Sequence, residues 1–511
     1  MYLAAFCSIF GGILLFCALR VWRLRKSRNP CGLPYPPRPK PKFLVGNLGD
    51  IPRGNNEWLE YMRMSEELGA DIVYYQVLGK NILVLNSFQA ANDLLDKRSA
   101  VFSDRPRLPL LKELKGWDWN LLVMSYHEGF ATHRRLVQQS FQPSVVTKDH
   151  HPVMQREVLV LLRNLLEQPI DFVPHLKRMA GAIIMMVTYG YEVAPKDDKF
   201  VRLAEEIRDL GSKTPSLSAL VDFMPALKYL PTWFPGASFH RLARHSTKLS
   251  TMMREAPFQM VKERLANGTA QPSLVSSLLD RAVSGEDIDD ALIKNCGGVV
   301  YSAGADTTAS ALTNAMLALM RYPDVQERAH RELDQVIGRD RLPAFEDRSK
   351  LPYIGALLKE VLRWKVVTPL GVPHCTTQDE VYRGTFIPER TIVIANLHAM
   401  LHDKTIYEDP DRFEPERHLL QEDDSASDSF RMSFGFGRRI CPGRYFAEDS
   451  IWLALASILQ VFQISKLVDA TGRPIDTHVT WTSGLVSNAS PFTCNITTRF
   501  PGAESLLVDV D

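Results

Sequence analysis

Phe434-Gly-Phe-Gly-Arg-Arg-Ile-Cys-Pro-Gly443 is the stretch that governs the interpretation of this sequence of 511 residues. It places one cysteine, Cys441, in a glycine-hinged loop just before an apolar run that favours a helix. Pro442 suits the first position of that helix, where a missing N–H does no harm. The positive end of the helix dipole and the neighbouring arginines then favour the thiolate form of Cys441, which is the form that binds a redox metal. A buried structural cysteine in a turn is the ordinary alternative.

The fixed offsets of Phe, Gly, Arg, Cys and Gly in this stretch resemble the haem-binding loop of the cytochromes P-450, the haem-thiolate monooxygenases. The resemblance implies a mainly α fold with small β-sheets, in which one large catalytic domain (residues 51–511) binds haem b. It also implies that Cys441 is the axial ligand of the haem iron, and that Phe434, Arg439 and Gly443 contact the cofactor. Glycines at 437 and 443 are expected to let the backbone pass close under the flat macrocycle.

A long helix is predicted over residues 287–320, and its centre departs from the usual helix composition. Interior glycines cost about 1 kcal/mol each relative to alanine, so we expect something to approach this helix closely. The glycines concerned are Gly297, Gly298 and Gly304. Ala303-Gly-Ala-Asp-Thr-Thr308 is similar to the family's oxygen-activation motif, which implies that Thr307 hydrogen-bonds dioxygen and that Asp306 relays protons through water. A stripe of small residues for helix packing is the alternative interpretation.

A second helix, over residues 351–363, places Glu360 and Arg363 on one face at a spacing of i, i+3. An ordinary surface ion pair is the simplest explanation of that spacing. Phe413-Glu-Pro-Glu-Arg417, however, is similar to the second arginine element of the family. The resemblance implies a buried set of Glu360, Arg363 and Arg417, which is structural and stabilises the core that presents the haem loop.

Further site residues follow from the same resemblance. Arg134 and His374 are expected to contact the haem propionates. Phe130 stands where the family usually has a tryptophan, so the indole N–H donor is missing there. The segments expected to form the substrate pocket contribute Leu108, Ala303, Val367, Leu370 and Leu485.

Short β-strands are predicted in two regions outside the helices. Runs rich in β-branched and aromatic residues occupy 72–78 and 82–85 around a Gly79-Lys-Asn81 turn, which is typical of a hairpin. Residues 382–394 are predicted as a further strand.

The N-terminal residues 1–28 combine an uncharged run, Tyr2–Leu19, with a basic segment on its C-terminal side. The run is about long enough to span a bilayer, and the basic flank predicts a cytosolic body. A cleaved signal peptide is the alternative, although it would need basic residues before the apolar run. A proline-rich hinge, residues 29–50, follows the predicted anchor. Seven scattered cysteines without a CxxC pair indicate a reducing compartment, and the resemblance implies the endoplasmic reticulum membrane.

Partners are predicted from what the sequence contains and lacks. The net charge of the chain is +1, which does not indicate nucleic-acid binding. The sequence has no glycine-rich dinucleotide fingerprint, so electrons must come from another protein. The resemblance implies an NADPH-dependent flavoprotein reductase as that donor.

The predicted function is insertion of one oxygen atom of dioxygen into a hydrophobic small molecule. The sequence resembles fungal members that act in secondary metabolism, and a terpenoid is the first expected substrate. Two alternatives remain open: a haem-thiolate isomerase or dehydratase, and a non-catalytic haem carrier or sensor.

Overall fold

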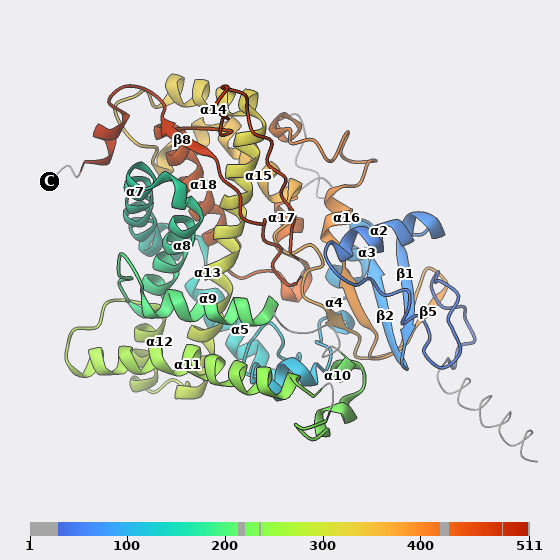
Figure 1. Cartoon of the computed structure of the whole chain (residues 1–511). Helices are drawn as coiled ribbons and strands as arrows, with labels where there is room; N and C mark the ends of the chain where they lie inside the picture. The colour runs from blue at the N-terminus through green and yellow to red at the C-terminus, as the bar shows by residue number, and fades with distance from the viewer. Residues whose placement is uncertain (1–28, 213–219, 235–236, 420–428, 483, 509–511) are drawn as a thin grey trace, which may run out of the picture.

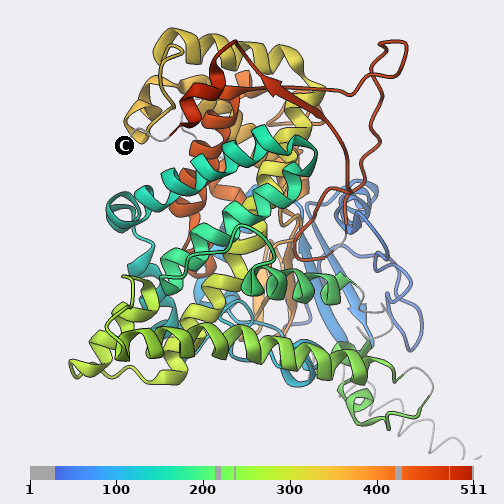
Figure 2. The same ribbon diagram turned by 60° about the vertical axis from the view of Figure 1, so that its left-hand side comes forward.

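Helix α13 (Asp290–Arg321) runs through the centre of the protein, where the other long helices surround it (Figures 1 and 2). Asp289 caps its start, because the carboxylate accepts the Leu292 N–H at 2.7 Å. The helix ends at Arg321, before Pro323. Its C-terminal half is buried on all faces, and α13 packs against α8 (Phe172–Tyr189). The prediction of one long helix here is confirmed.

The computed structural model describes residues 29–212, 220–234, 237–419, 429–482 and 484–508. The described residues form ten further helices of ten residues or more, most of which surround α13. They are α2 (Glu57–Leu68), α5 (Glu128–Ser140), α7 (His151–Glu167), α8, α9 (Lys199–Ser212), α11 (Phe239–Ala266), α12 (Leu274–Val283), α14 (Pro323–Val336), α15 (Pro352–Trp364) and α18 (Arg444–Val461). The shorter helices are α3 (Phe88–Ala91), α4 (Ser99–Phe102), α6 (Pro143–Val145), α10 (Leu220–Phe223), α16 (Leu397–Leu401) and α17 (Ser429–Ser433).

The strands form small sheets, and the largest lies to one side of the helices (Figure 1). Its order is β1-β2-β6-β3: β1 (Ile72–Val77) and β2 (Lys80–Leu85) are antiparallel, β2 and β6 (Ile392–Ala395) are parallel, and β3 (His374–Cys375) is antiparallel to β6. The two remaining sheets are antiparallel pairs, β4 (Glu380–Tyr382) with β5 (Thr385–Ile387) and β7 (Phe462–Ser465) with β8 (Asn495–Thr498). The mainly α fold with small sheets is therefore as predicted, and so is the first hairpin.

The prediction of one strand over residues 382–394 is wrong. Arg383 and Gly384 adopt positive φ angles of 48° and 74°, which turn the chain back and pair β4 with β5. Arg390, with φ of 59°, makes a second break before β6 begins. One strand was predicted because the apolar sequence pattern continues across these two breaks. A continuous strand does not accommodate left-handed backbone at these positions.

The proline-rich segment is packed on the first sheet over part of its length. Tyr74 donates its N–H to the Pro37 carbonyl and Phe386 donates to the Pro34 carbonyl, both at 2.8 Å. Tyr35 stacks on Tyr74 with ring centroids 5.2 Å apart. The predicted anchor, Tyr2–Leu19, lies outside the described residues. Among the residues that the structure describes, no helix is long and apolar enough to cross a membrane.

Candidate active site

A cavity of about 710 Å³ lies beside the centre of α13 and reaches the loop before α18. It brings together most of the side chains that the sequence predicted for the site. Those lining it are Arg134, Ala303, Asp306, Thr307, Val367, His374, Phe434, Arg439, Cys441, Gly443 and Leu485. Leu108 and Leu370 are not among the lining residues. Leu108 precedes a short helical turn, Pro109–Leu114, and it is Leu111 of this turn that lines the cavity. Leu370 packs against the apolar cluster around Tyr75.

Cys441 occupies one wall of this cavity, and its N–H donates to the Phe434 carbonyl at 2.9 Å. The expected helix start is wrong by two residues, because α18 begins at Arg444 and Gly443 is its N-cap. Burial raises the pKa of the Cys441 thiol, although the Gly443 N–H, Arg134 and Arg444 oppose this effect. The local field alone therefore does not favour the thiolate, contrary to expectation. A coordinated metal ion reverses that balance, because a thiol bound to a metal is deprotonated.

Gly437 is required by a backbone contact. Its φ is +54°, and a Cβ at this position would lie 2.1 Å from the Leu95 carbonyl oxygen. The glycine thus allows the loop to pass over the helical turn that ends at Lys97. Gly443 has only the Cys441 sulfur within 4.0 Å of such a Cβ. Both glycines were expected to make room for the macrocycle. For Gly437 the structure gives a different reason, which is close packing against the backbone of Leu95.

Three of the arginines that line the cavity have backbone carbonyls as partners. Arg105 donates to Leu122, Val372 and Pro373, Arg439 donates to Ser103, Leu121 and Met124, and Arg134 donates to Ile440. Among the described residues, none of the three forms an ion pair with a carboxylate.

Burial and the nearby Arg439 lower the pKa of Arg105, and burial lowers the pKa of Arg439 to about 10. His374 is also buried against the cavity, with Nδ1 2.7 Å from the Phe102 carbonyl oxygen. Asp104 is the carboxylate that acts on Arg105 and Arg439, and it forms no salt bridge with either among the described residues. A buried group of cations that exceeds its nearby carboxylates favours an anionic ligand. The two propionates of haem fit this requirement, and the Cys441 sulfur in the same cavity is an atom of the type that binds iron.

Sequence reasoning missed Arg105 as a member of this group. Arg105 lies directly between Asp104 and Pro106, close to a second arginine at 107, and nothing local shows that its side chain turns toward the cavity. Phe130, which stands where the family usually has a tryptophan, also contacts this group of arginines. Its ring lies 3.7 Å from the Arg439 guanidinium carbon, so Phe130 contacts that arginine through its aromatic face.

Asp306 and Thr307 lie on the cavity face of α13. The Thr307 hydroxyl donates to the Ala303 carbonyl at 3.0 Å, within the helix. Asp306 forms an ion pair with Arg208 of α9, with Nη1 and Oδ1 3.0 Å apart. A second cavity of about 200 Å³ adjoins the first, and Lys177, Arg208 and Asp306 line both. Asp306 is thus placed between the main cavity and a smaller one, whose lining includes the polar side chains of Ser310, Thr313 and Asn488.

The glycines of α13 are approached by side chains of the protein. A Cβ at Gly298 would lie 2.8 Å from the Trp119 ring, and one at Gly304 would lie 2.7 Å from Ile184. The expectation of a close approach to this helix is confirmed, and its cause is packing.

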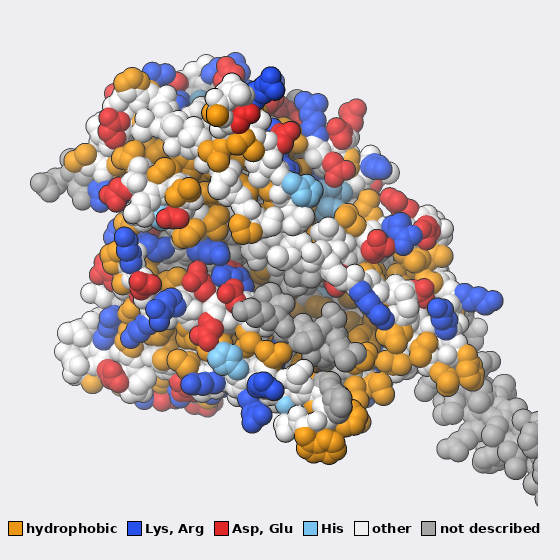
Figure 3. Space-filling view, in the orientation of Figure 1, with side chains coloured by type: hydrophobic (Ala, Val, Ile, Leu, Met, Phe, Trp, Pro, Cys, Tyr) orange, Lys and Arg blue, Asp and Glu red, His pale blue; other side chains and the backbone are white. Residues whose placement is uncertain are grey.

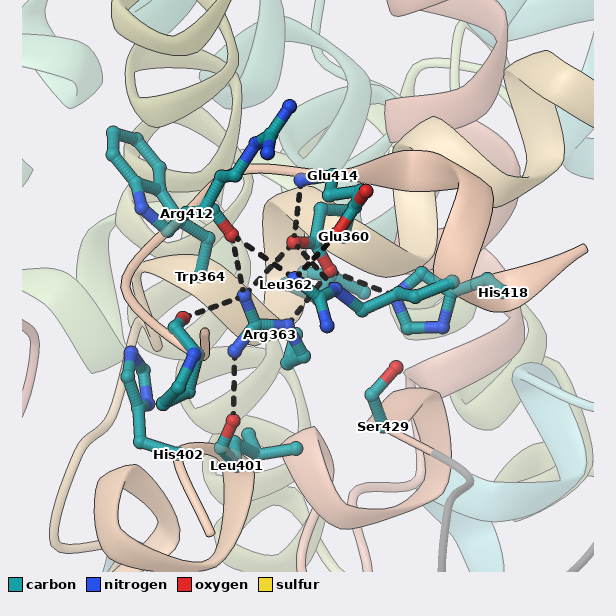
Figure 4. A network of polar contacts seen from close by, with 12 residues as sticks. Glu360, Leu362, Arg363, Trp364, Leu401, His402, Arg412, Glu414, His418 and Ser429 are labelled. Carbon is teal, nitrogen blue, oxygen red and sulfur yellow. Dashed lines mark hydrogen bonds and ion pairs between the residues drawn. The ribbon is translucent and has the colours of Figure 1, made fainter. Parts of the chain in front are cut away.

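Glu360 and Arg363 form a fully buried ion pair behind the cavity, with Nε 2.7 Å from Oε2 (Figure 4). Arg363 also donates to the carbonyls of Leu401, Pro410 and Arg412. Arg417 reaches Glu360 at 3.3 Å, and His418 Nε2 lies 2.8 Å from its other oxygen. Burial opposes ionisation of Glu360, but hydrogen bonds from Arg363 and His418 hold its pKa below the usual value. His418 was not predicted; it follows Arg417 directly in the sequence.

The comparisons with known proteins agree on one family. The family model for cytochrome P450 matches residues 36–495. A cytochrome P450 monooxygenase of Armillaria gallica is 39% identical over 498 residues, which is 96% of this chain and 97% of the relative. Cytochrome P450 monooxygenase 208 of Postia placenta is 39% identical, with 97% and 96% covered, and cytochrome P450 monooxygenase claR of Ampulloclitocybe clavipes is 38% identical, with 92% and 88% covered. With a matching family model over most of its length, a mainly helical fold, and a cysteine and buried arginines lining one cavity, this chain belongs to the cytochrome P450 family and is a haem-dependent monooxygenase.

Proposed function

We propose that this monooxygenase inserts one oxygen atom of dioxygen into a hydrophobic secondary metabolite, with a terpenoid as the first candidate. The observation that carries the proposal is that Cys441 and the Asp306–Thr307 pair line the same cavity. The apolar part of that cavity supports a hydrophobic substrate, and its members include Leu111, Val123, Ala303, Val367 and Val486. The named relatives are fungal monooxygenases, which is consistent with this class of substrate.

In this proposal Cys441 would bind the haem iron through its sulfur, and Phe434 and Gly443 would contact the cofactor from the same loop. Arg134, Arg439 and His374 would hold the two propionates, and Arg105 would join them because it lines the same cavity and its hydrogen bonds all go to backbone carbonyls. When bound, the thiolate-ligated haem supplies the oxygen-activating chemistry. The buried set of Glu360, Arg363 and Arg417 has a structural role behind this loop.

The chain's own contribution to the reaction is proton transfer on the α13 side. Thr307 holds a proton at Oγ1, which in the structure is directed to the Ala303 carbonyl. Rotation of the hydroxyl is needed before it can donate into the cavity. Asp306 carries a proton acceptor between the two cavities, so water in the smaller one can exchange protons with it. Its ion pair with Arg208 orients the carboxylate toward α9 in this structure.

We also propose that an NADPH-dependent flavoprotein reductase supplies the electrons. Arg438 is exposed within the Cys441 loop, and its charge fits an acidic partner surface there.

We propose further that the protein is attached to the endoplasmic reticulum membrane. Residues 1–28 would form the anchor and residues 29–50 the hinge before the catalytic domain. Hydrophobic side chains gather at the lower edge of the face in Figure 3, near α10, where Tyr229 and Trp233 are 78% and 79% exposed. Such aromatic side chains favour a membrane–water interface.

The decisive test of the iron ligand is Cys441→Ser. We expect the reduced protein to lose the strongly red-shifted carbon monoxide band that a thiolate ligand gives, because a hydroxyl does not replace a thiolate at iron. Cys375→Ser and Cys494→Ser are the controls, since both thiols are buried outside the cavity, and they should retain the band. Retention of the band in Cys441→Ser contradicts the assignment.

The activity is tested on the parent protein, which is assayed with reductase, NADPH and a terpene panel. Conversion without NADPH would indicate an isomerase, and haem binding without any conversion would indicate a carrier.

A further inference from the structure

The loop between residues 115 and 127 forms one wall of the main cavity and is held at several points. Trp119 donates its indole N–H to Ser250 Oγ at 2.9 Å and packs against Gly298 of α13. Arg105 and Arg439 donate to carbonyls of the same loop, at Leu122 and Met124 respectively. These contacts fix the backbone around Asn120.

The side-chain amide of Asn120 has a defined orientation. Its oxygen accepts the Leu122 N–H at 2.9 Å, so the amide nitrogen must point the other way, toward α13. There Nδ2 donates to Ser302 Oγ at 3.2 Å, and Ser302 in turn donates to the Val299 carbonyl at 3.0 Å. Asn120 is only 4% exposed, and both Asn120 and Ser302 line the cavity.

This arrangement leaves one hydrogen of the amide nitrogen for a ligand. An amide nitrogen carries two donors, and within the described part of the chain Ser302 is the one acceptor for Asn120 Nδ2. The neighbouring wall is apolar, with Leu121, Val123 and Ala303 around the amide. Buried donors are normally hydrogen-bonded, and a few placed polar groups in an apolar pocket fix the orientation of a ligand.

We propose that Asn120, oriented by Leu122 and Ser302, is a specificity-determining residue that donates a hydrogen bond to a hydroxyl or carbonyl oxygen of the substrate. The inference rests on the proposed function and narrows it: the substrate is a largely apolar molecule that already carries an oxygen. A reaction that introduces a hydroxyl or carbonyl group must act before this enzyme.

The test compares matched ligands on the haem-loaded full chain. Valencene with nootkatone, and cedrane with cedrol, differ by one oxygen function within each pair, and binding is followed by the ligand-induced absorbance change of the haem. A neutral hydrogen bond corresponds to roughly a 3- to 10-fold difference in affinity. We expect the parent to bind at least one oxygenated member about 10-fold more tightly than its hydrocarbon. Absence of such a preference for either pair overturns the inference.

The variants then locate the preference. Asn120→Asp keeps the oxygen that accepts the Leu122 N–H but removes the donor, so the preference should disappear while the hydrocarbons still bind. Asn120→Leu removes both groups without adding charge and should give the same loss. Asn295→Asp is the matched control, since its amide contacts His133 and does not line the cavity, and it should leave the preference unchanged.

A preference that survives both Asn120 variants contradicts the inference. Failure of the proposed function gives a different result, because the parent would then lack the thiolate band or NADPH-dependent conversion of every ligand. Conversion of hydrocarbon and oxygenated members with equal affinity leaves the proposed function intact and removes only the role of Asn120.

Discussion

Glu360–Arg363 and Arg208–Asp306 are ion pairs of the same chemical groups in opposite surroundings. Both side chains of the first pair are 0% exposed, and two further side chains and three backbone carbonyls complete their hydrogen bonds. In the second pair Arg208 and Asp306 are 26% and 23% exposed and lie between two cavities. The first pair therefore cannot open without breaking a network of buried polar contacts, whereas water can replace either partner of the second. A fixed pair suits the support of the haem loop, and an exchangeable pair suits proton transfer.

The sharpest test of this difference is Glu360→Ala. It leaves Arg363 buried without its carboxylate, which costs about 3–5 kcal/mol for a broken buried pair. We expect the free energy of unfolding to fall by that amount and the haem-loaded fraction to fall with it. Unfolding in urea and the carbon monoxide difference spectrum measure the two quantities.

The chain offers a control of the same spacing and direction. Glu60 and Arg63 form an i, i+3 pair at 2.8 Å on α2, and both side chains are 54% exposed. An exposed pair contributes about 0–1 kcal/mol, so Glu60→Ala should change the free energy of unfolding very little. Equal losses in the two variants would show that burial does not separate the pairs.

The two ion pairs compared above, Glu360–Arg363 and Arg208–Asp306, also show what the sequence could and could not predict. Glu360 and Arg363 are close because the helix brings residues three apart together, and Arg417 followed from a family motif. Arg208 and Asp306 are 98 residues apart on different helices, and no local pattern of α9 points to the site. The same limit applies to Leu370, whose apolar character fits a pocket as well as the cluster around Tyr75 in which it lies. Cys441 was found because its loop is a continuous motif, but the pKa of its thiol depends on burial, which a sequence does not show.

The next largest effect is expected at Asp306 and concerns turnover. If Asp306 supplies protons, Asp306→Asn should lower product formation ~10²-fold or more, the effect of removing a general acid–base group. Thr307→Ala is the contrasting variant, because it removes a hydroxyl and leaves the carboxylate. We expect it to keep haem and substrate binding but to divert NADPH to hydrogen peroxide. Product and peroxide formed per NADPH are the measurements. Product yield per NADPH in Thr307→Ala equal to that of the parent would contradict the role of the hydroxyl.

The smallest effect is expected at Arg208, and it tests whether the second pair really is exchangeable. Arg208→Gln removes the charge but keeps a side chain that can hydrogen-bond. Because both partners are partly exposed, the free energy of unfolding should change by about 0–1 kcal/mol, far less than in Glu360→Ala. Turnover should change no more than a few-fold, since water can take the place of the guanidinium beside Asp306. The double variant Arg208→Gln/Asp306→Asn should then turn over as slowly as Asp306→Asn alone, because the carboxylate and not the cation carries the proton. If Arg208→Gln alone were as slow as Asp306→Asn, the two residues would act as one unit, and the pair would be as indispensable to turnover as Glu360–Arg363 is to folding.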